Sequence, residues 1–313
     1  LEVHQFLGDG SYVGSLGRLG EFRGAFQDIS RIQVDSSVLW VTDPSLNRLT
    51  SFESSSGELL EVVAFDSMHH NQPEYAELDF DVIQPVGRVE SGRYLVTLSD
   101  ERNPVYQPTF TNRYGFATAD ESGGLELHPV FEEDARRYVV GDYAGRPVAF
   151  SLDINERPLI EFSNDGSIFV AHSSEFFIRV FTKEGQIRRS YRYPHKREEL
   201  NPEKQIYPSY TYNRQLLMVR ESATYPDFWP ALYHMIVDDQ QRLWVSTVLK
   251  DRDVSEWFVI DDRTNQLIHS FMWPSDKPIR TVKNGYAYTI EPNSAGFGTV
   301  VRYKIDLETS NSL

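Results

Sequence analysis

The 313-residue sequence contains no cysteine. This excludes disulfide bonds, thiolate zinc sites and cysteine nucleophiles. No stretch approaches the roughly 18 consecutive apolar residues of a transmembrane helix. Positive charge is scarce, because 31 Lys and Arg stand against 46 Asp and Glu, a formal net charge of −15. This balance argues against nucleic-acid binding and against docking on an anionic membrane. We interpret it as a solvated acidic surface, with an acidic funnel for a cationic ligand as the alternative.

The chain opens at Leu1 rather than Met, and no signal peptide is present. We therefore expect a mature or trimmed product whose targeting segment has been removed. Its 40% hydrophobic and 25% charged residues are those of an ordinary globular protein. Nineteen Phe, 17 Tyr and five Trp are present, many of them in short runs with Val and Ile, which favours strands.

A repeating unit of four short strands is clearest between residues 29 and 65. Turn residues separate its apolar segments, with Asp35-Ser36-Ser37 after the first strand and Ser56-Gly57 before the last. The strands are expected at residues 29–34, 38–43, 47–52 and 59–63. Four short antiparallel strands joined by such turns make one blade of a β-propeller.

The same pattern recurs further along the chain and includes the hairpin signal Asn284-Gly285. Further copies are expected at residues 86–131, 160–193, 235–273 and 279–305. Their irregular spacing places insertions in loops, the long ones being residues 66–80, 100–112, 132–146 and 194–230. In repeat proteins such insertions usually lie on one face, often the binding face.

The N-terminal residues read as an incomplete blade. Residues 3–7 and 11–16 look like its last two strands, and its first two would precede Leu1. We predict an all-β fold, a six-bladed β-propeller of four-stranded antiparallel blades that forms a single domain over residues 1–307. Five blades result instead if this half-blade completes the C-terminal one. Residues 308–313 are expected to be a flexible C-terminal tail.

Three segments of the chain carry a family resemblance: the glycine-rich run that ends in Gly20-Glu21-Phe22, residues 39–52 around Leu39-Trp40-Val41, and residues 225–245. They resemble NHL-repeat six-bladed propellers, especially those of bacterial secreted proteins and lipoproteins. The usual Gly-Pro-Gly element is shortened here. The resemblance covers most of the chain and implies an extracytoplasmic location, whether periplasmic, cell-surface lipoprotein or secreted. It implies little about activity, because this architecture hosts lactonases, lyases, ligand sensors and protein-binding scaffolds.

The richest candidate surface is the 194–230 insertion, which clusters aromatic residues with prolines. Its charged run at residues 197–200 is expected to form one short helical turn. Aromatic side chains anchor protein interfaces and stack on sugars, because they add large rigid area at low entropy cost. The alternative is that they pack the loop onto the propeller. The candidate binding residues are Tyr207, Tyr210, Tyr212, Tyr225, Phe228 and Trp229, with Arg102 and Tyr106 of the 100–113 loop as weaker companions.

Other residues that suggest a ligand have simpler explanations. His69 and His70 are adjacent in an extended segment, so their side chains diverge, and a solvated acidic loop explains them better. His234 is expected to be a packed or turn histidine. The run 14–20 lacks the Gly-Lys-Ser/Thr ending of a phosphate loop and is interpreted as a glycine-rich blade turn.

Two acidic segments offer oxygen ligands for calcium, residues 153–156 and Asp261-Asp262 with Asn265. Neither has the spacing of an EF-hand loop, and turn capping by Asp and Asn is the preferred interpretation. We therefore predict no metal and no cofactor. Calcium or another divalent ion would be needed only if the chain were a propeller enzyme with a channel metal, whose ligands come from different blades.

The functional prediction rests on long aromatic loops without a recognisable catalytic set. We predict a non-catalytic extracytoplasmic propeller that presents its loops to a protein partner, or to a larger assembly, or to a glycan-like ligand. The alternative is a metal-dependent enzyme of the lactonase or lyase type that acts in the central channel.

Overall fold

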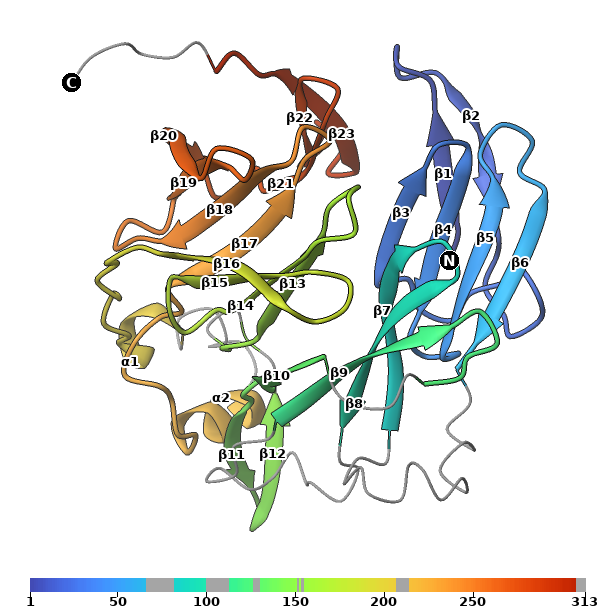
Figure 1. Cartoon of the computed structure of the whole chain (residues 1–313). Coiled ribbons are helices and arrows are strands. Elements are labelled where there is room, and N and C mark those ends of the chain that lie inside the picture. Colours follow the sequence, from blue (N-terminus) through green and yellow to red (C-terminus); the bar gives the residue numbers. More distant parts are fainter. Residues whose placement is uncertain are drawn as a thin grey trace. The chain divides into compact units, whose positions relative to one another are not determined.

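The computed structural model describes residues 1–65, 82–99, 113–125, 130–150, 152, 155–206 and 214–307. It is an all-β propeller, as predicted, built of small antiparallel sheets (Figure 1). The chain forms two compact units, residues 1–103 with 112–133, and residues 104–111 with 134–313. The prediction of one domain over residues 1–307 stays a prediction, and the tail predicted at 308–313 lies outside the described residues.

The first unit contains a hairpin and two four-stranded sheets. The hairpin pairs β1 (Val3–Phe6) with β2 (Tyr12–Leu16). The first sheet consists of β3 (Arg31–Asp35), β4 (Val38–Asp43), β5 (Arg48–Glu53) and β6 (Leu59–Ala64). The second consists of β7 (Val82–Glu90), β8 (Arg93–Ser99), β9 (Arg113–Asp120) and β10 (Phe131–Asp134).

The second unit contains the hairpin β11 (Val139–Tyr143) and β12 (Arg146–Phe150). Its first sheet consists of β13 (Pro158–Phe162), β14 (Ile168–His172), β15 (Phe177–Phe181) and β16 (Ile187–Arg192). The next consists of β17 (Leu232–Val237), β18 (Arg242–Val248), β19 (Val254–Asp261) and β20 (Gln266–Pro274). A three-stranded sheet follows, made of β21 (Ile279–Lys283), β22 (Tyr286–Pro292) and β23 (Gly298–Lys304). Helices α1 (Pro202–Gln205) and α2 (Arg214–Glu221) lie between β16 and β17 in the sequence.

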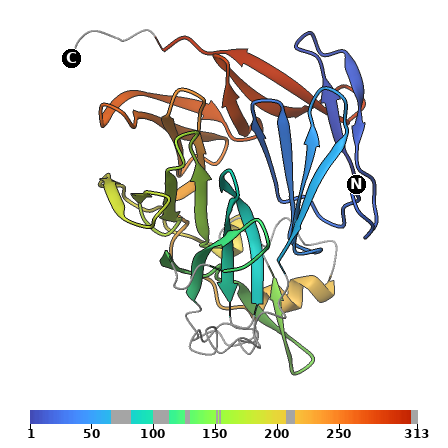
Figure 2. The ribbon, with the colours of Figure 1, turned by 45° about the vertical axis from the view of Figure 1, so that its right-hand side comes forward.

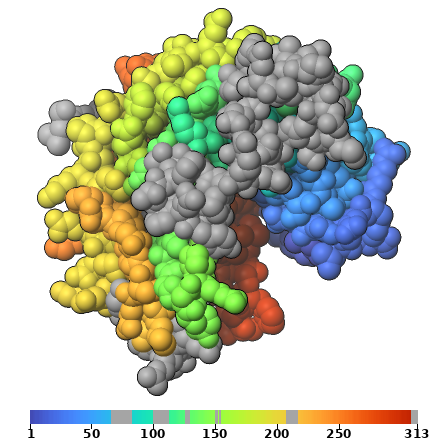
Figure 3. All heavy atoms as spheres, turned by 90° about the horizontal axis from the view of Figure 1, so that it is seen from below, coloured from blue at the N-terminus to red at the C-terminus, as the bar shows by residue number. Residues whose placement is uncertain are grey.

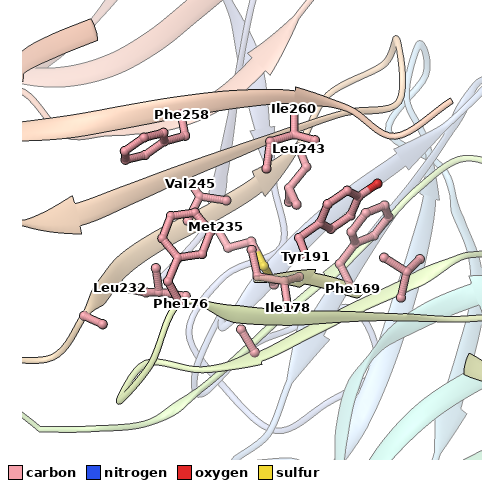
Figure 4. Close-up of a cluster of buried hydrophobic side chains, with 13 residues drawn as sticks. Phe169, Phe176, Ile178, Tyr191, Leu232, Met235, Leu243, Val245, Phe258 and Ile260 are labelled. Atoms are coloured by element: carbon pink, nitrogen blue, oxygen red, sulfur yellow. The ribbon is translucent and has the colours of Figure 1, made fainter. Parts of the chain in front are cut away.

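In the sheets that begin with β3, β13 and β17, the second strand is buried on both faces. In β4, β14 and β18 nearly every residue is buried, and their sequences are correspondingly almost continuous in apolar residues. Neighbouring sheets of the second unit pack face to face (Figure 2). Figure 4 shows one such core, in which Phe169 and Ile178 of one sheet meet Leu243 and Phe258 of the next. Burial of these apolar faces is the main stabilising contribution.

Strands are present in all five predicted repeats. The last strand predicted for the second repeat, at residues 125–131, is not confirmed, because residues 126–129 lie outside the described residues and β10 begins at Phe131. The predicted count of six blades is not confirmed either. Among the described strands, four sheets have four strands and one has three. The hairpin β1–β2 forms a sheet of its own rather than extending the β21–β23 sheet. It packs through Val3 and Leu16 on apolar residues of the β3–β6 sheet.

Two local predictions are wrong. The predicted loop at 132–146 contains all of β11, whose hairpin turns at Ala144 and Gly145 with positive φ at both residues, as in a type I′ turn. The helical turn predicted at 197–200 is absent, and the helix begins instead at Pro202. Asn201 explains the shift, because its side chain caps the helix by accepting a hydrogen bond from the Lys204 N–H at 3.2 Å.

Residues 14–16 of the glycine-rich run belong to β2, and residues 17–20 leave the strand without starting a helix. Gly17 has φ +74°, and a Cβ there would lie 2.2 Å from the Phe26 ring. A side chain at this position would be both strained and obstructed. The glycine therefore serves the close packing of Phe26 rather than a phosphate.

A buried carboxylate joins two sheets of the second unit. Asp262, directly after β19, has a side chain only 3% exposed. The Tyr191 hydroxyl of β16 donates a hydrogen bond to it at 2.6 Å, and Arg188 and Arg189 form ion pairs with it. Burial and the adjacent carboxylate raise the pKa of Tyr191 well above its ordinary value. Three polar side chains of one sheet thus depend on one residue of the next.

Removing this charge should destabilise the fold. We expect Asp262→Asn to lower the free energy of unfolding by about 3 kcal/mol, because it leaves two guanidinium groups without their buried partner. Asp261→Asn is the matched control, since Asp261 pairs with the exposed Arg263 and its turn-capping oxygen survives the change. Its effect should stay under about 1 kcal/mol. Urea unfolding measures both, and equal losses would refute the role of Asp262.

Candidate functional site

The 194–230 insertion is organised by two extended segments that run antiparallel. The Leu200 N–H donates to the Asp227 carbonyl at 2.9 Å, and the Trp229 N–H donates to the Glu198 carbonyl at 2.9 Å. An isolated bridge between Glu199 and Phe228 lies between these two hydrogen bonds. The described part of the insertion therefore presents a defined backbone.

Helix α2 attaches the insertion to the β11–β12 hairpin, and the two lie beside each other in Figure 3. The Asp142 N–H donates to the Ser222 hydroxyl at 2.7 Å, 80 residues away. Gly141 allows this contact, because a Cβ there would lie 2.0 Å from the Val219 carbonyl oxygen. The hairpin absent from the sequence prediction is thus part of the support for the insertion.

A buried ion-pair cluster fixes the start of the insertion. Glu156 is 4% exposed and pairs with both Arg137 and Arg197. The Arg197 Nε–H also donates to the Trp229 carbonyl at 2.8 Å. Because a buried carboxylate requires charged partners, this cluster determines where Arg197 and the chain around it lie.

The three described aromatic candidates have different surroundings. Trp229 is 7% exposed and packs with Val139, Ile206 and Val248, with the Arg252 guanidinium 3.8 Å from its ring centroid. The packing role weighed in the sequence analysis therefore describes Trp229. Tyr225 is half-buried, and its hydroxyl donates to a backbone carbonyl at 3.0 Å.

Phe228, by contrast, is 40% exposed. It lies with Tyr225 along an open groove of about 580 Å³. The groove is lined by Glu199, Leu200, Pro202, Glu203, Ala223, Tyr225, Pro226, Asp227 and Phe228. All of these residues belong to the second unit.

The structure brings together only part of the predicted set. Tyr225 and Phe228 share the groove, and Trp229 lies beneath the loop. Tyr207, Tyr210, Tyr212, Arg102 and Tyr106 lie outside the described residues.

Sequence reasoning missed the groove carboxylates of Glu199, Glu203 and Asp227. The signal that could have found them is the pair of charged and aromatic-proline runs at the two ends of one insertion. Their antiparallel pairing, however, is not encoded in either run alone.

The suspected calcium segments have other roles where the structure describes them. Asn155 accepts a hydrogen bond from the Leu152 N–H and donates to the Arg137 carbonyl, and Asp261 caps its own turn. These contacts confirm the turn-capping interpretation for both residues. His69 and His70 lie outside the described residues, as does Asp153. Within the described ranges, no three His, Asp or Glu side chains gather closely enough to hold a metal ion.

His234 is a packed histidine, as predicted. Its ring stacks on Trp257 with centroids 6.1 Å apart and an interplanar angle of 7°. Burial, together with the charges of Arg157 and Arg280, lowers the pKa of His234 to about 4. The imidazole is therefore neutral at neutral pH.

Across the described residues, no helix is both long and apolar enough to cross a membrane.

Loss of the Arg197 guanidinium should disturb the groove. We expect Arg197→Met to lower the free energy of unfolding by about 3 kcal/mol, because the buried Glu156 carboxylate keeps only one partner. The Leu200 and Trp229 amides, which tie the two segments together, should exchange faster with solvent. Arg192→Met is the control, since Arg192 and its partner Glu175 are 73% and 53% exposed. It should cost less than about 1 kcal/mol and leave these amides protected, whereas unchanged exchange in Arg197→Met would contradict the assignment.

No family model and no curated protein sequence matches this chain. Among solved structures, a member of the DUF4221 family from Bacteroides vulgatus is 13% identical, with a TM-score of 0.49 over 97% of this chain and 86% of its own. A Bacteroides fragilis protein described as exported is 11% identical, with a TM-score of 0.48 over 93% and 74%. A streptogramin B lyase is 14% identical, with a TM-score of 0.36 over 88% and 67%. Likenesses this distant carry no argument about function.

Proposed function

We propose that the chain is a non-catalytic extracytoplasmic propeller that binds a protein partner through the groove beside Phe228. The observation that carries the proposal is the groove itself. It is a concave surface of about 580 Å³ with an exposed aromatic ring, and it is supported by the buried Glu156 cluster. A rigid scaffold with function placed on its loops is the usual arrangement in such folds.

The charge of the groove favours a cationic partner. Glu199, Glu203 and Asp227 are exposed, and none of them forms an ion pair within the described residues. No Lys or Arg is among the described residues that line the groove. Unpaired carboxylates attract positive charge and accelerate encounter with it. The exposed Phe228 ring offers an apolar anchor, and the Arg197 guanidinium of the chain itself lies 5.6 Å from its centroid.

The preferred partner is therefore a protein segment that carries Lys or Arg beside an apolar residue. A neutral glycan is the competing ligand, because aromatic rings and carboxylates also bind sugars through stacking and hydrogen bonds. The two differ in their response to salt, since only the charged partner should lose affinity as salt screens the carboxylates.

The NHL-type repeat, the six-blade count and the extracytoplasmic location belong to the same proposal. The separate β1–β2 sheet supports six blades, because it is available as part of a further blade. An experimental structure in which β1–β2 completes the β21–β23 sheet would establish five instead.

Site-specific photocrosslinking tests the groove. A benzoylphenylalanine at position 228 should crosslink one protein at fixed ratio in an extract of the source organism. The same group at position 297 is the matched control, because Phe297 is 71% exposed but outside the groove. Crosslinks of equal yield at both positions, or none at 228, would count against the proposal.

The charge requirement is tested with defined probes. The peptide Lys-Trp-Lys, blocked at both ends, should bind, and Glu199→Gln with Asp227→Asn should weaken it about threefold to tenfold at 0.15 M salt. The control pair Glu58→Gln with Asp276→Asn changes the net charge equally at exposed positions outside the groove. Cellohexaose binding that is unaffected by salt would instead support the glycan.

The rival proposal is a metal-dependent lactonase or lyase. It requires a bound divalent ion, so metal analysis and the thermal midpoint with and without chelator separate the two. We expect no stoichiometric metal and a midpoint that chelator leaves within about 1 °C, because binding at the groove needs no ion. A stoichiometric metal whose removal lowers the midpoint would favour the enzyme.

A further inference from the structure

A pocket separate from the acidic groove lies between two neighbouring sheets of the second unit. Its volume is about 270 Å³, close to the lower end of the range for small-molecule sites, which is roughly 300–1,000 Å³. Among its lining residues, Arg192 comes from β16, Phe258 from β19 and Leu267 from β20. The last strand of one sheet therefore forms one wall of this pocket, and the last two strands of the next sheet form the other.

Tyr193, directly after β16, presents an aromatic ring in this pocket. It is 44% exposed, and its ring packs against those of Phe176 and Phe258, with centroids 5.5 and 5.0 Å away. Phe176 and Phe258 are both buried, and Figure 4 shows them in the core between the two sheets. The Tyr193 N–H also donates to the Phe176 carbonyl at 3.2 Å. The Tyr193 ring is thus held by buried rings and still offers apolar surface to a ligand.

Two polar side chains lie on opposite walls of the same pocket. Ser190 is in β16, and Asn265 is in the turn between β19 and β20. Both residues are exposed, and neither side chain forms a hydrogen bond with another described residue. A hydroxyl group and a carboxamide can each donate and accept, so this pair suits a ligand that carries hydroxyl groups.

Buried hydrogen bonds hold the two walls in place. Tyr191, which follows Ser190 in β16 and also lines the pocket, donates from its hydroxyl to the buried Asp262 at 2.6 Å. The turn that carries Asn265 begins beside Asp262, and the Asn265 N–H donates to the Asp261 carbonyl at 2.8 Å. A site whose walls are already positioned loses less conformational freedom when a ligand binds.

The charge of this pocket favours a neutral ligand. Among the described residues that line it, Arg192 is the one charged residue, and its guanidinium pairs with Glu175 at 3.1 Å. No carboxylate is among these lining residues, although the chain has a net charge of −15. The pocket thus offers an aromatic ring, the exposed aliphatic Leu267 and uncharged polar groups, which calls for a ligand with an apolar face and hydroxyl groups.

We propose that this pocket binds one pyranose ring of a neutral sugar. A pyranose has an apolar face of C–H groups and a rim of hydroxyl groups. The C–H face stacks on the Tyr193 ring, while the hydroxyl groups form hydrogen bonds with Ser190 and Asn265. The pocket shares no residue with the acidic groove, so the proposal stands independently of the function proposed for that groove.

Titration with single sugars tests the pocket. The probes are the methyl glycosides of glucose, galactose, mannose and N-acetylglucosamine, and sorbitol is the control because it has hydroxyl groups but no pyranose ring. Binding is followed by the NMR signals of the Tyr193 ring, assigned by their loss in Tyr193→Phe. We expect at least one glycoside, and not sorbitol, to shift these signals until they saturate. The proposal is overturned if no glycoside shifts them or if sorbitol shifts them equally.

Substitution of Asn265 separates this pocket from other surfaces. Asn265→Gly should weaken binding of the responding glycoside about threefold to tenfold, because the hydrogen bonds of the amide are lost while glycine keeps the φ of +61°. Asn284→Gly is the matched control, since Asn284 has a φ of +54° in a turn outside the pocket.

Phe228→Ala distinguishes this site from a sugar bound in the acidic groove, and it should leave the affinity for the glycoside unchanged. Equal weakening by Asn265→Gly and Asn284→Gly would contradict the proposal. A loss of binding in Phe228→Ala with unchanged affinity in Asn265→Gly would contradict it as well, because the sugar would then be bound in the groove.

Discussion

The buried carboxylate of Glu156 constrains the second unit of this chain. At 4% exposure it must be paired, and both of its partners come from segments outside the regular sheets. Arg137 precedes the β11–β12 hairpin, and Arg197 begins the large insertion. One charge therefore orders the two segments that support the groove. A purely apolar contact would allow either segment to slide, whereas guanidinium–carboxylate geometry does not.

Asp262 is a second buried carboxylate that is paired with arginines, and it connects two sheets. Its carboxylate accepts from Tyr191 and pairs with Arg188 and Arg189, so polar strands at the outer edge of one sheet are tied to the next. Asp238 connects residues within one sheet, because its carboxylate accepts a hydrogen bond from the Trp244 indole N–H at 2.8 Å. Among the described residues, Glu156, Asp238 and Asp262 are buried and paired with arginines. The fully buried Asp43 is stabilised differently, because it accepts hydrogen bonds from backbone N–H groups.

The strands could be predicted because their information is local: alternating or continuous apolar residues bounded by turn residues. The β11–β12 hairpin and α2 could not, because each is stabilised by the other across 80 residues of sequence. For a related reason, the aromatic residues of the candidate site could be predicted from the sequence but their exposure could not. Composition marks Phe228 and Trp229 alike as aromatic residues beside prolines, but only the packing against Val139 and Val248 makes Trp229 a core residue. Exposure is decided by partners distant in the sequence.

The net charge of the chain likewise predicts the charge of its surface as a whole better than the charge of any one binding site. The net charge of −15 left an acidic funnel for a cationic ligand as the alternative to a solvated surface, and three carboxylates line the groove beside Phe228. Elsewhere in the same unit, the positive charges of Arg157 and Arg280 act on His234. Surfaces of opposite charge can coexist in one unit because a ligand responds mainly to charges within about one Debye length, roughly 8 Å at physiological salt. The long-range field of the chain governs solubility and encounter, while a few residues on adjacent strands govern which ion is bound.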